Sequence, residues 1–205
     1  MAPLSLTAAD QRMTTVTGKI RIAALAALAA IPVVAQAQTS DAAQRMSAYN
    51  DAVIGIMKAK AALPARADRF EPVVKAYYDM PTIAGLVVGP GWASAPASDR
   101  AAAIAALTRH SAVSLARNFT SYAGERFTVD PKVVERGPDR VVKVTINTDV
   151  LLYRMRQSGG QWKIVDVISS GVSSLSLQRA DLQSTIQAGG IPGLIKRLGQ
   201  LDAVK

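Results

Sequence analysis

The feature that most constrains the fold is a change in hydrophobic period after Gly124. Before that residue, apolar side chains recur every three or four positions, which is typical of one face of a helix. After it they alternate with polar side chains, most clearly over 142–147, where the order is Val-Lys-Val-Thr-Ile-Asn. The stretches 127–133, 151–156 and 162–164 carry the same alternation. Four such stretches with short connections predict an antiparallel meander with one apolar face and one solvated face.

The last predicted strand departs from strict alternation. Trp162 and Ile164 keep the pattern, but Val165 and Val167 add apolar side chains on the other side, and Asp166 falls on the side of Trp162. A β-bulge would explain the departure. Cover on both faces of the sheet would explain it equally well.

The chain before the strands predicts a helical region over 38–123. Thr39 or Ser40 can cap its first helix, because their hydroxyl groups accept a hydrogen bond from a free backbone N–H. Asp79 can cap a shorter helix that ends at the Gly-Pro-Gly break of 89–91. Four apolar residues form one stripe on the first helix: Met46, Tyr49, Val53 and Met57.

The longest helix is expected over 96–122. Ile104, Leu107 and Leu115 lie near one of its faces, and several alanines widen that face. Alanines permit close packing of neighbouring elements, and they can also leave room for a ligand beneath the helix.

A second helical region over 173–201 closes the chain. The pair Gly189-Gly190 is expected to end one helix, and Pro192 can begin another. The order of helices, strands and helices predicts an α+β protein. The expected architecture is a curved four-stranded antiparallel sheet over 125–170 with a helical lobe packed on its apolar face, in one domain over 38–205.

Residues 1–37 have the features of a secretory signal peptide. Lys19 and Arg21 precede an apolar run over 22–34, which is shorter than the roughly 20 residues that span a membrane. An Ala-Gln-Ala cleavage pattern follows at 35–37. The alternative is a buried helix of alanine and leucine. The basic flank and the cleavage pattern favour export of a soluble mature chain that begins at residue 38.

Composition restricts the chemistry of the chain. The absence of cysteine excludes disulfides and thiolate metal sites, and the single histidine, His110, lies within an expected helix. No Gly-x-Ser-x-Gly motif is present, so the sequence does not favour a serine hydrolase. The net charge of +9 favours anionic partners such as lipid headgroups. Nucleic acid is not an expected partner of an exported protein. The aromatic content of 5% also argues against it, because proteins that bind single-stranded nucleic acid stack the bases on aromatic side chains.

Two motifs, in their order and spacing, resemble those of one family. Residues 78–84 are Tyr-Asp-Met-Pro-Thr-Ile-Ala and are followed by Gly89 and Trp92. Residues 162–167 are Trp-Lys-Ile-Val-Asp-Val and lead into the C-terminal helical region. Over 49–198 the chain resembles the MlaC family of periplasmic lipid carriers, also called the toluene-tolerance (Ttg) family. It is equally similar to the hopanoid-associated branch of that family, HpnM.

The resemblance implies a sheet related to the NTF2-like cone, with a lipid cavity between the sheet and the helices. It implies a periplasmic shuttle whose cargo is a phospholipid or a hopanoid-type lipid. The implied partners are an inner-membrane complex of an MCE-domain protein with an ABC transporter, and an outer-membrane lipoprotein complex. Such a system maintains the lipid asymmetry of the outer membrane. The resemblance implies neither a catalytic step nor a cofactor, since the lipid is cargo.

Ten apolar and aromatic residues are candidates for the wall of such a cavity. Four come from the helical region: Leu86, Val87, Leu107 and Leu115. Six come from the predicted strands: Phe127, Val144, Ile146, Leu151, Tyr153 and Trp162.

Two other functions stay open on the sequence. In an adaptor protein, the apolar face of the sheet would be filled entirely by the chain's own side chains. In an enzyme of the NTF2-like type, Asp166 and Tyr153 would face an apolar substrate as an acid/base pair.

The signal segment yields a first prediction. Expression in a host with a general secretory pathway is expected to give a mature protein whose N-terminal sequence is Gln38-Thr39-Ser40. N-terminal sequencing or intact-mass measurement of periplasmic and cytoplasmic fractions checks this. Recovery of mainly uncleaved protein in the cytoplasm would contradict it.

Overall fold

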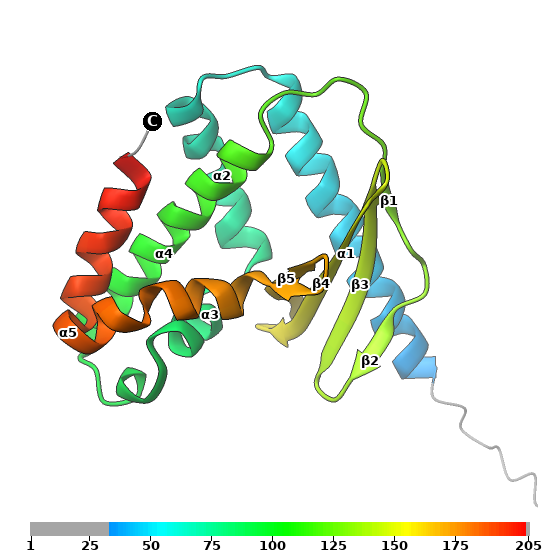
Figure 1. Ribbon diagram of the computed structural model, residues 1–205. Coiled ribbons are helices and arrows are strands. Elements are labelled where there is room, and N and C mark those ends of the chain that lie inside the picture. The colour runs from blue at the N-terminus through cyan, green and yellow to red at the C-terminus, as the bar shows by residue number, and fades with distance from the viewer. Residues whose placement is uncertain (1–32, 204–205) are drawn as a thin grey trace, which may run out of the picture. The chain divides into compact units, whose positions relative to one another are not determined.

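Helices form the first part of the chain, strands the middle and a kinked helix the end (Figure 1). The computed structural model describes residues 33–203, so the predicted signal segment lies outside the described residues except for 33–37. The helices are α1 (Val33–Lys58), α2 (Leu63–Tyr77), α3 (Met80–Val88), the 3-10 helix η1 (Gly89–Trp92), α4 (Ala97–Asn118) and α5 (Ser174–Ala203). The strands are β1 (Phe127–Val129), β2 (Val134–Arg136), β3 (Asp139–Ile146), β4 (Asp149–Ser158), β5 (Gln161–Ser169) and β6 (Val172–Ser173).

The α+β class is confirmed, but the sheet has six strands where four were predicted. Its order is β1-β3-β4-β5-β6, with β2 also paired to β3, and all neighbours are antiparallel. The strand predicted over 127–133 ends early, because β1 stops at Val129 and β2 begins only at Val134. Asp130 turns the chain there by accepting a hydrogen bond from the Lys132 amide (2.9 Å), and Pro131 has no N–H to offer a ladder. β6 is too short for an alternating pattern to reveal it.

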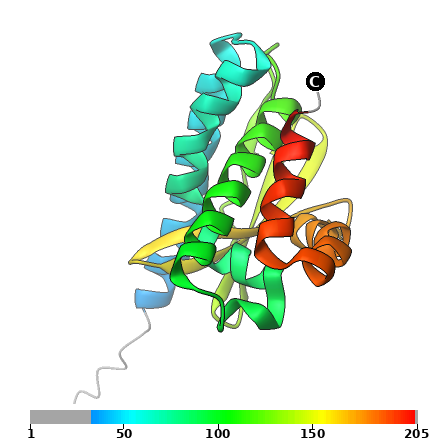
Figure 2. The same cartoon turned by 90° about the vertical axis from the view of Figure 1, so that its left-hand side faces the viewer.

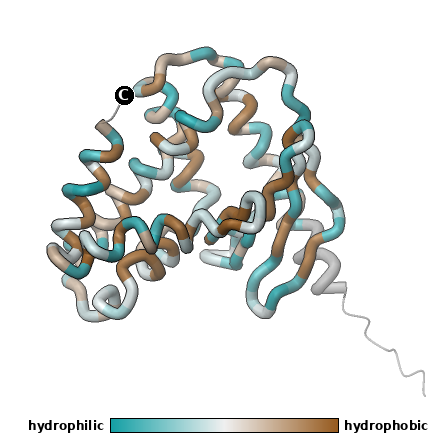
Figure 3. The backbone as a smooth tube through the Cα atoms, viewed as in Figure 1, coloured by the Kyte–Doolittle hydropathy of each residue, from teal (hydrophilic) through white to brown (hydrophobic). Residues whose placement is uncertain are grey.

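Alternation correctly predicted the apolar face of the sheet. Val142 pairs with Tyr153 and Val144 pairs with Leu151, so these four side chains point to the same side. Val142 and Val144 are fully buried. α1 packs on this part of the face, where the ring of Tyr49 lies edge-on to the ring of Tyr153 with centroids 5.8 Å apart. Figure 3 shows hydrophobic and hydrophilic stretches alternating along the strands and the helices.

A bulge in β5 accounts for its broken alternation. Arg154 pairs with Asp166 and Met155 pairs with Ile164, which leaves Val165 as the extra residue. Asp166 therefore lies on the side of Arg154, opposite the apolar face. Both explanations that the sequence left open hold, because the register shows the bulge and the consecutive residues Ile164, Val165 and Asp166 are all buried.

Three details of the predicted helices are wrong. α1 runs through Thr39 and Ser40, so neither residue caps it, because the preceding alanines and glutamines are themselves good helix formers. The helix predicted over 96–122 starts after Pro96 as expected but ends before Phe119, which adopts φ −109° and ψ 79°. With 26 residues against 22, α1 is the longest uninterrupted helix.

Other local signals are confirmed. Asp79 caps α3, because its carboxylate accepts hydrogen bonds from the Thr82 amide (3.2 Å) and hydroxyl (2.8 Å). Gly190, at φ 58° and ψ −152°, divides α5 into two helical halves that run in different directions (Figure 1). The second half lies beside α4, as both views show (Figure 2). No helix within residues 33–203 is both long and apolar enough to cross a membrane.

A buried guanidinium fastens α2 to the end of α4. Nε of Arg66 donates to the Ala116 carbonyl at 2.8 Å. Nη1 donates to the carbonyls of Ala61 (2.7 Å) and Thr120 (2.9 Å). The carbonyls of Ala116 and Thr120 lie at the end of α4, where the helix has no further backbone donors to offer, and the carbonyl of Ala61 lies just before α2, so the arginine joins the two helices.

A second prediction concerns this contact. Arg66→Met keeps much of the apolar length of the side chain but removes three hydrogen bonds from a charged donor. We expect the free energy of unfolding to fall by about 3 kcal/mol. Arg69→Met, on the same helix at an exposed position, is the matched control and is expected to change it by less than about 0.5 kcal/mol. Chemical denaturation of both variants measures the free energy of unfolding. Equal losses in the two variants would show that the Arg66 hydrogen bonds contribute no more to stability than an exposed arginine does.

Candidate functional site

A cavity of about 820 Å³ lies between the sheet, α4 and the first half of α5. The sheet contributes Phe127, Ile146 and Leu151 to its wall, α4 contributes Leu115, and α5 contributes Leu182. Its volume falls within the range of roughly 300–1,000 Å³ that is common for small-molecule sites. The sheet and the helices thus leave a hollow where a continuous core would otherwise form.

The cavity opens beside two apolar side chains. Val150, at the start of β4, is 47% exposed, and Leu177, in the first turns of α5, is 54% exposed. Both also line the cavity. Polar residues stand among the wall residues as well, including Ser114 and Asn118 of α4. A ligand in the cavity would therefore meet apolar walls inside and a mixed rim at the surface.

Five of the ten residues predicted for the wall are brought together around this cavity. They are Leu115, Phe127, Ile146, Leu151 and Tyr153. They come from α4, β1, β3 and β4, which the antiparallel register and the packing of α4 place next to one another. The alternation pattern identified the four strand residues, because all of them point to the apolar face.

The other five predicted residues lie elsewhere. Val87, Leu107, Val144 and Trp162 are buried in the filled part of the core and do not line the cavity. Leu86 is 40% exposed and lines a second, smaller pocket. The sequence pattern marked these side chains as apolar and inward-facing, but it carries no signal that separates a filled region from a hollow one.

Several wall residues were not predicted. Tyr49 and Met57 of α1 were assigned to a core stripe, and Tyr78 was read only as part of a motif. Leu175 and Leu182 of α5 were treated as the buried stripe of a helix. The helical spacing of Tyr49 and Met57, eight residues apart on one face, was the available signal.

Three tyrosines form one polar part of the cavity wall. The hydroxyl groups of Tyr49 and Tyr78 lie 3.0 Å apart, and the ring of Tyr153 packs edge-on against Tyr49. Burial raises the pKa of Tyr78 to about 12. Burial also raises the pKa of Tyr49, to which Tyr78 and Tyr153 add. Burial and Tyr78 raise the pKa of Tyr153, while its hydrogen bond with Tyr49 lowers it by less. All three hydroxyl groups stay neutral, so this part of the wall offers hydrogen bonds without charge.

The end of α5 is tied to α4 beside the cavity. Nδ1 of His110 lies 2.7 Å from a carboxylate oxygen of Asp202. Nη2 of Arg117 donates to the Leu201 carbonyl at 3.2 Å. His110 and Leu201 both line the cavity, so these contacts fix part of its wall.

Comparison with known proteins identifies the family. The sequence model described as MlaC protein matches residues 47–200, about three quarters of the chain. The chain belongs to the MlaC family. The match confirms the resemblance to the MlaC family as a whole, and both sequence motifs lie within the matched range.

A solved structure supports the fold of this MlaC-family chain. It is a phospholipid-binding protein from Ralstonia solanacearum in complex with a phospholipid, and it superposes with a TM-score of 0.64. The match covers 80% of this chain and 97% of that one at 21% sequence identity. A search of curated proteins finds no match.

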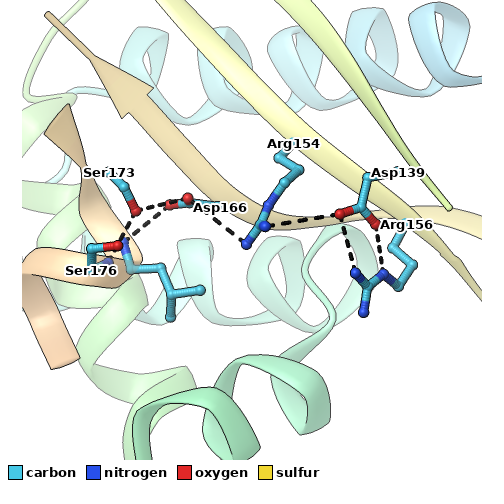
Figure 4. A network of polar contacts seen from close by, with 7 residues as sticks. Asp139, Arg154, Arg156, Asp166, Ser173 and Ser176 are labelled. Atoms are coloured by element: carbon cyan, nitrogen blue, oxygen red, sulfur yellow. Dashed lines mark hydrogen bonds and ion pairs between the residues drawn. The ribbon is translucent and has the colours of Figure 1, made fainter. Parts of the chain in front are cut away.

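Asp166 and Tyr153, the acid/base pair considered for an enzyme, both line the cavity, but they leave opposite faces of the sheet, because Val167 and not Asp166 pairs with Tyr153. The Asp166 carboxylate instead accepts hydrogen bonds from the Ser173 hydroxyl (2.8 Å) and the Leu175 amide (3.1 Å), as Figure 4 shows in part. Within residues 33–203, no three histidine or carboxylate side chains gather as a metal site would require.

A third prediction separates the hollow from the filled part of one strand. Val144 and Ile146 point to the same face of β3, but only Ile146 lines the cavity. Val144→Trp is expected to lower the free energy of unfolding of lipid-free protein by about 1–3 kcal/mol or more, since it overpacks a filled core. Ile146→Trp places its ring in the hollow, and we expect less than about 1 kcal/mol. Thermal and chemical unfolding check the pair, and the reverse order would refute the position of the cavity.

Proposed function

We propose that this protein carries a lipid through an aqueous compartment, with the apolar part of the lipid in the large cavity and its headgroup at the opening. The observation that carries the proposal is the cavity of about 820 Å³ between the apolar face of the sheet and the helices. A cavity with apolar walls loses contacts when it is empty, because its lining atoms have no partners on one side. An apolar ligand restores those contacts.

The energetics of lipid transfer require such a site. An acyl chain with about fourteen methylenes costs on the order of 11 kcal/mol to expose to water, at roughly 0.8 kcal/mol for each methylene. A carrier must supply a dry surface of similar extent. The headgroup needs no such site, because a charged phosphate is best left where water or basic side chains can reach it.

Phospholipid is the cargo that we propose first, because a solved protein with a similar fold is a phospholipid-binding protein. A hopanoid-type lipid is the alternative that the sequence resemblance offers, since a polycyclic body would fill the same apolar space. The lipid is cargo, and we propose no cofactor and no covalent step.

The setting that we propose is the periplasm. The basic, apolar and Ala-Gln-Ala order of residues 19–37 supports export, and the net charge of +7 that remains after removal of residues 1–37 suits an encounter with anionic lipid surfaces. By its membership of the family, the protein would exchange lipid with an inner-membrane complex of an MCE-domain protein and an ABC transporter. An outer-membrane lipoprotein complex would be its second partner. Any ATP hydrolysis belongs to the transporter.

The fourth prediction tests the cargo directly. Protein purified without detergent from a membrane-containing host is expected to release about one lipid per chain into an organic extract, as measured by mass spectrometry with internal standards. Ile146→Trp is expected to retain several-fold less lipid, because the indole occupies the cavity. Thr145→Trp, the next residue on the opposite face of β3, is the matched control and is expected to retain the wild-type amount.

Two outcomes would contradict the proposal. Folded wild-type protein that is repeatedly free of lipid would favour the adaptor function. Equal loss of lipid in Ile146→Trp and Thr145→Trp would place the lipid outside this cavity.

A further inference from the structure

A second pocket, of about 170 Å³, lies where α3, β4 and α5 meet. Its strand residues, Arg154 and Arg156, point away from the apolar face, because they alternate with Tyr153 and Met155 along β4. Val165 and Leu175 line both this pocket and the large cavity. The second pocket and the large cavity are therefore adjacent and share these two wall residues.

Arg154 has an unusual position in this pocket. Its guanidinium lies between two carboxylates, 3.8 Å from Asp139 and 3.9 Å from Asp166 (Figure 4). Both separations exceed hydrogen-bond length. Its Nε atom is buried and has no hydrogen-bond partner among the described residues. A guanidinium has five N–H donors, so Arg154 keeps its capacity to bind an acceptor.

The two carboxylates are already satisfied by other donors. Asp139 receives two hydrogen bonds from Arg156, at 2.6 and 3.1 Å (Figure 4). Asp166 receives hydrogen bonds from Ser173 and from the Leu175 amide at the start of α5. The guanidinium of Arg154 thus lies within ion-pair distance of both carboxylates but donates a hydrogen bond to neither.

The wall formed by α5 adds further free donors. Arg179 and the hydroxyl of Ser176 line the pocket, and neither has a hydrogen bond or ion pair among the described residues. Thr82, on the α3 side, donates its hydroxyl to Asp79 and offers only an acceptor. The guanidinium groups of Arg154, Arg156 and Arg179 therefore line the pocket, and the carboxylates of Asp139 and Asp166 lie beside them. A bound anion would neutralise the remaining positive charge.

We propose that this second pocket binds a phosphate group, held by Arg154, Arg179 and Ser176. Guanidinium groups match the spacing of phosphate oxygens and can donate two parallel hydrogen bonds to them. The phosphate has two possible sources: the headgroup of the lipid in the adjacent cavity, or free phosphate. The headgroup source rests on the proposed carrier function and places the phosphate beyond the shared wall of Val165 and Leu175, instead of at the opening beside Val150 and Leu177. The free-phosphate source is independent of the carrier function.

The experiment measures the two sources separately on the full mature chain. In the first arm, delipidated protein is titrated with inorganic phosphate at constant ionic strength, with chloride as the reference, and binding is followed by calorimetry. In the second arm, the same protein is titrated with phosphatidylglycerol and with a diacylglycerol that has the same acyl chains but no phosphate. A headgroup site is expected to make the phospholipid bind about tenfold or more tightly than the diacylglycerol.

Three variants assign the effect to the pocket. Arg154→Gln and Arg179→Gln are each expected to remove most of the preference for phosphatidylglycerol while leaving diacylglycerol binding unchanged. Arg179 is exposed, so its variant keeps the test valid if Arg154→Gln folds poorly. Lys163→Gln is the matched control, because Lys163 pairs with Arg156 on the same face but does not line the pocket.

The outcomes are distinct. Binding of inorganic phosphate that both arginine variants lose, without any preference between the two lipids, assigns the pocket to free phosphate. Equal affinity of wild-type protein for both lipids, together with no binding of phosphate, overturns the proposal but leaves the carrier function standing. The proposal is also overturned if Lys163→Gln weakens binding as much as the arginine variants do, since the net positive charge of the protein, and not this pocket, would then explain the binding. If neither lipid binds, the carrier function fails. The titration with inorganic phosphate then decides by itself whether the second pocket binds phosphate.

Discussion

The structure depends on an apolar sheet face that the helices cover only in part. α1 and its neighbours pack on the part that carries Val142, Val144, Met155 and Ile164, and these side chains are completely buried. Farther along the same strands, Ile146 and Leu151 meet the cavity instead. A hollow supplies none of the close contacts that stabilise a protein interior. The filled part must therefore supply the stability of the fold, and the Arg66 contacts between α2 and α4 belong to that scaffold.

Tyrosines mark the boundary between the filled and the hollow parts. Tyr49, Tyr78 and Tyr153 pack with each other on the core side, and all three also line the cavity. Their rings add to the core, while their hydroxyl groups satisfy one another at the edge of the cavity. Because burial keeps these groups neutral, the boundary is polar without bringing a charge next to an apolar ligand.

The bulge in β5 affects the walls of both pockets, because it sets the side of the sheet on which Asp166 lies. The bulge at Val165 turns Asp166 away from the apolar face, where it caps the start of α5 through Ser173 and the Leu175 amide. That cap fixes the direction in which α5 leaves the sheet, and α5 supplies one wall of each pocket. It also places a second carboxylate near Arg154, at a distance that leaves the guanidinium without a hydrogen bond.

The sequence by itself determined the α+β class, the apolar face of the sheet, the cap at Asp79 and the kink at Gly190, because each follows from local spacing or from one residue's backbone preference. Alternation also assigned Phe127, Ile146, Leu151 and Tyr153 to the apolar face, and Leu115 to a helix stripe. It could not separate them from Val144 or Trp162, since a residue that faces a hollow has the same pattern as one that faces a filled core. The tertiary structure alone decided where the helices stop covering the sheet. It also decided which side Asp166 occupies and that Arg154 lies near two carboxylates without a hydrogen bond to either, because these depend on the register of β4 with β5 and on contacts between residues far apart in the chain.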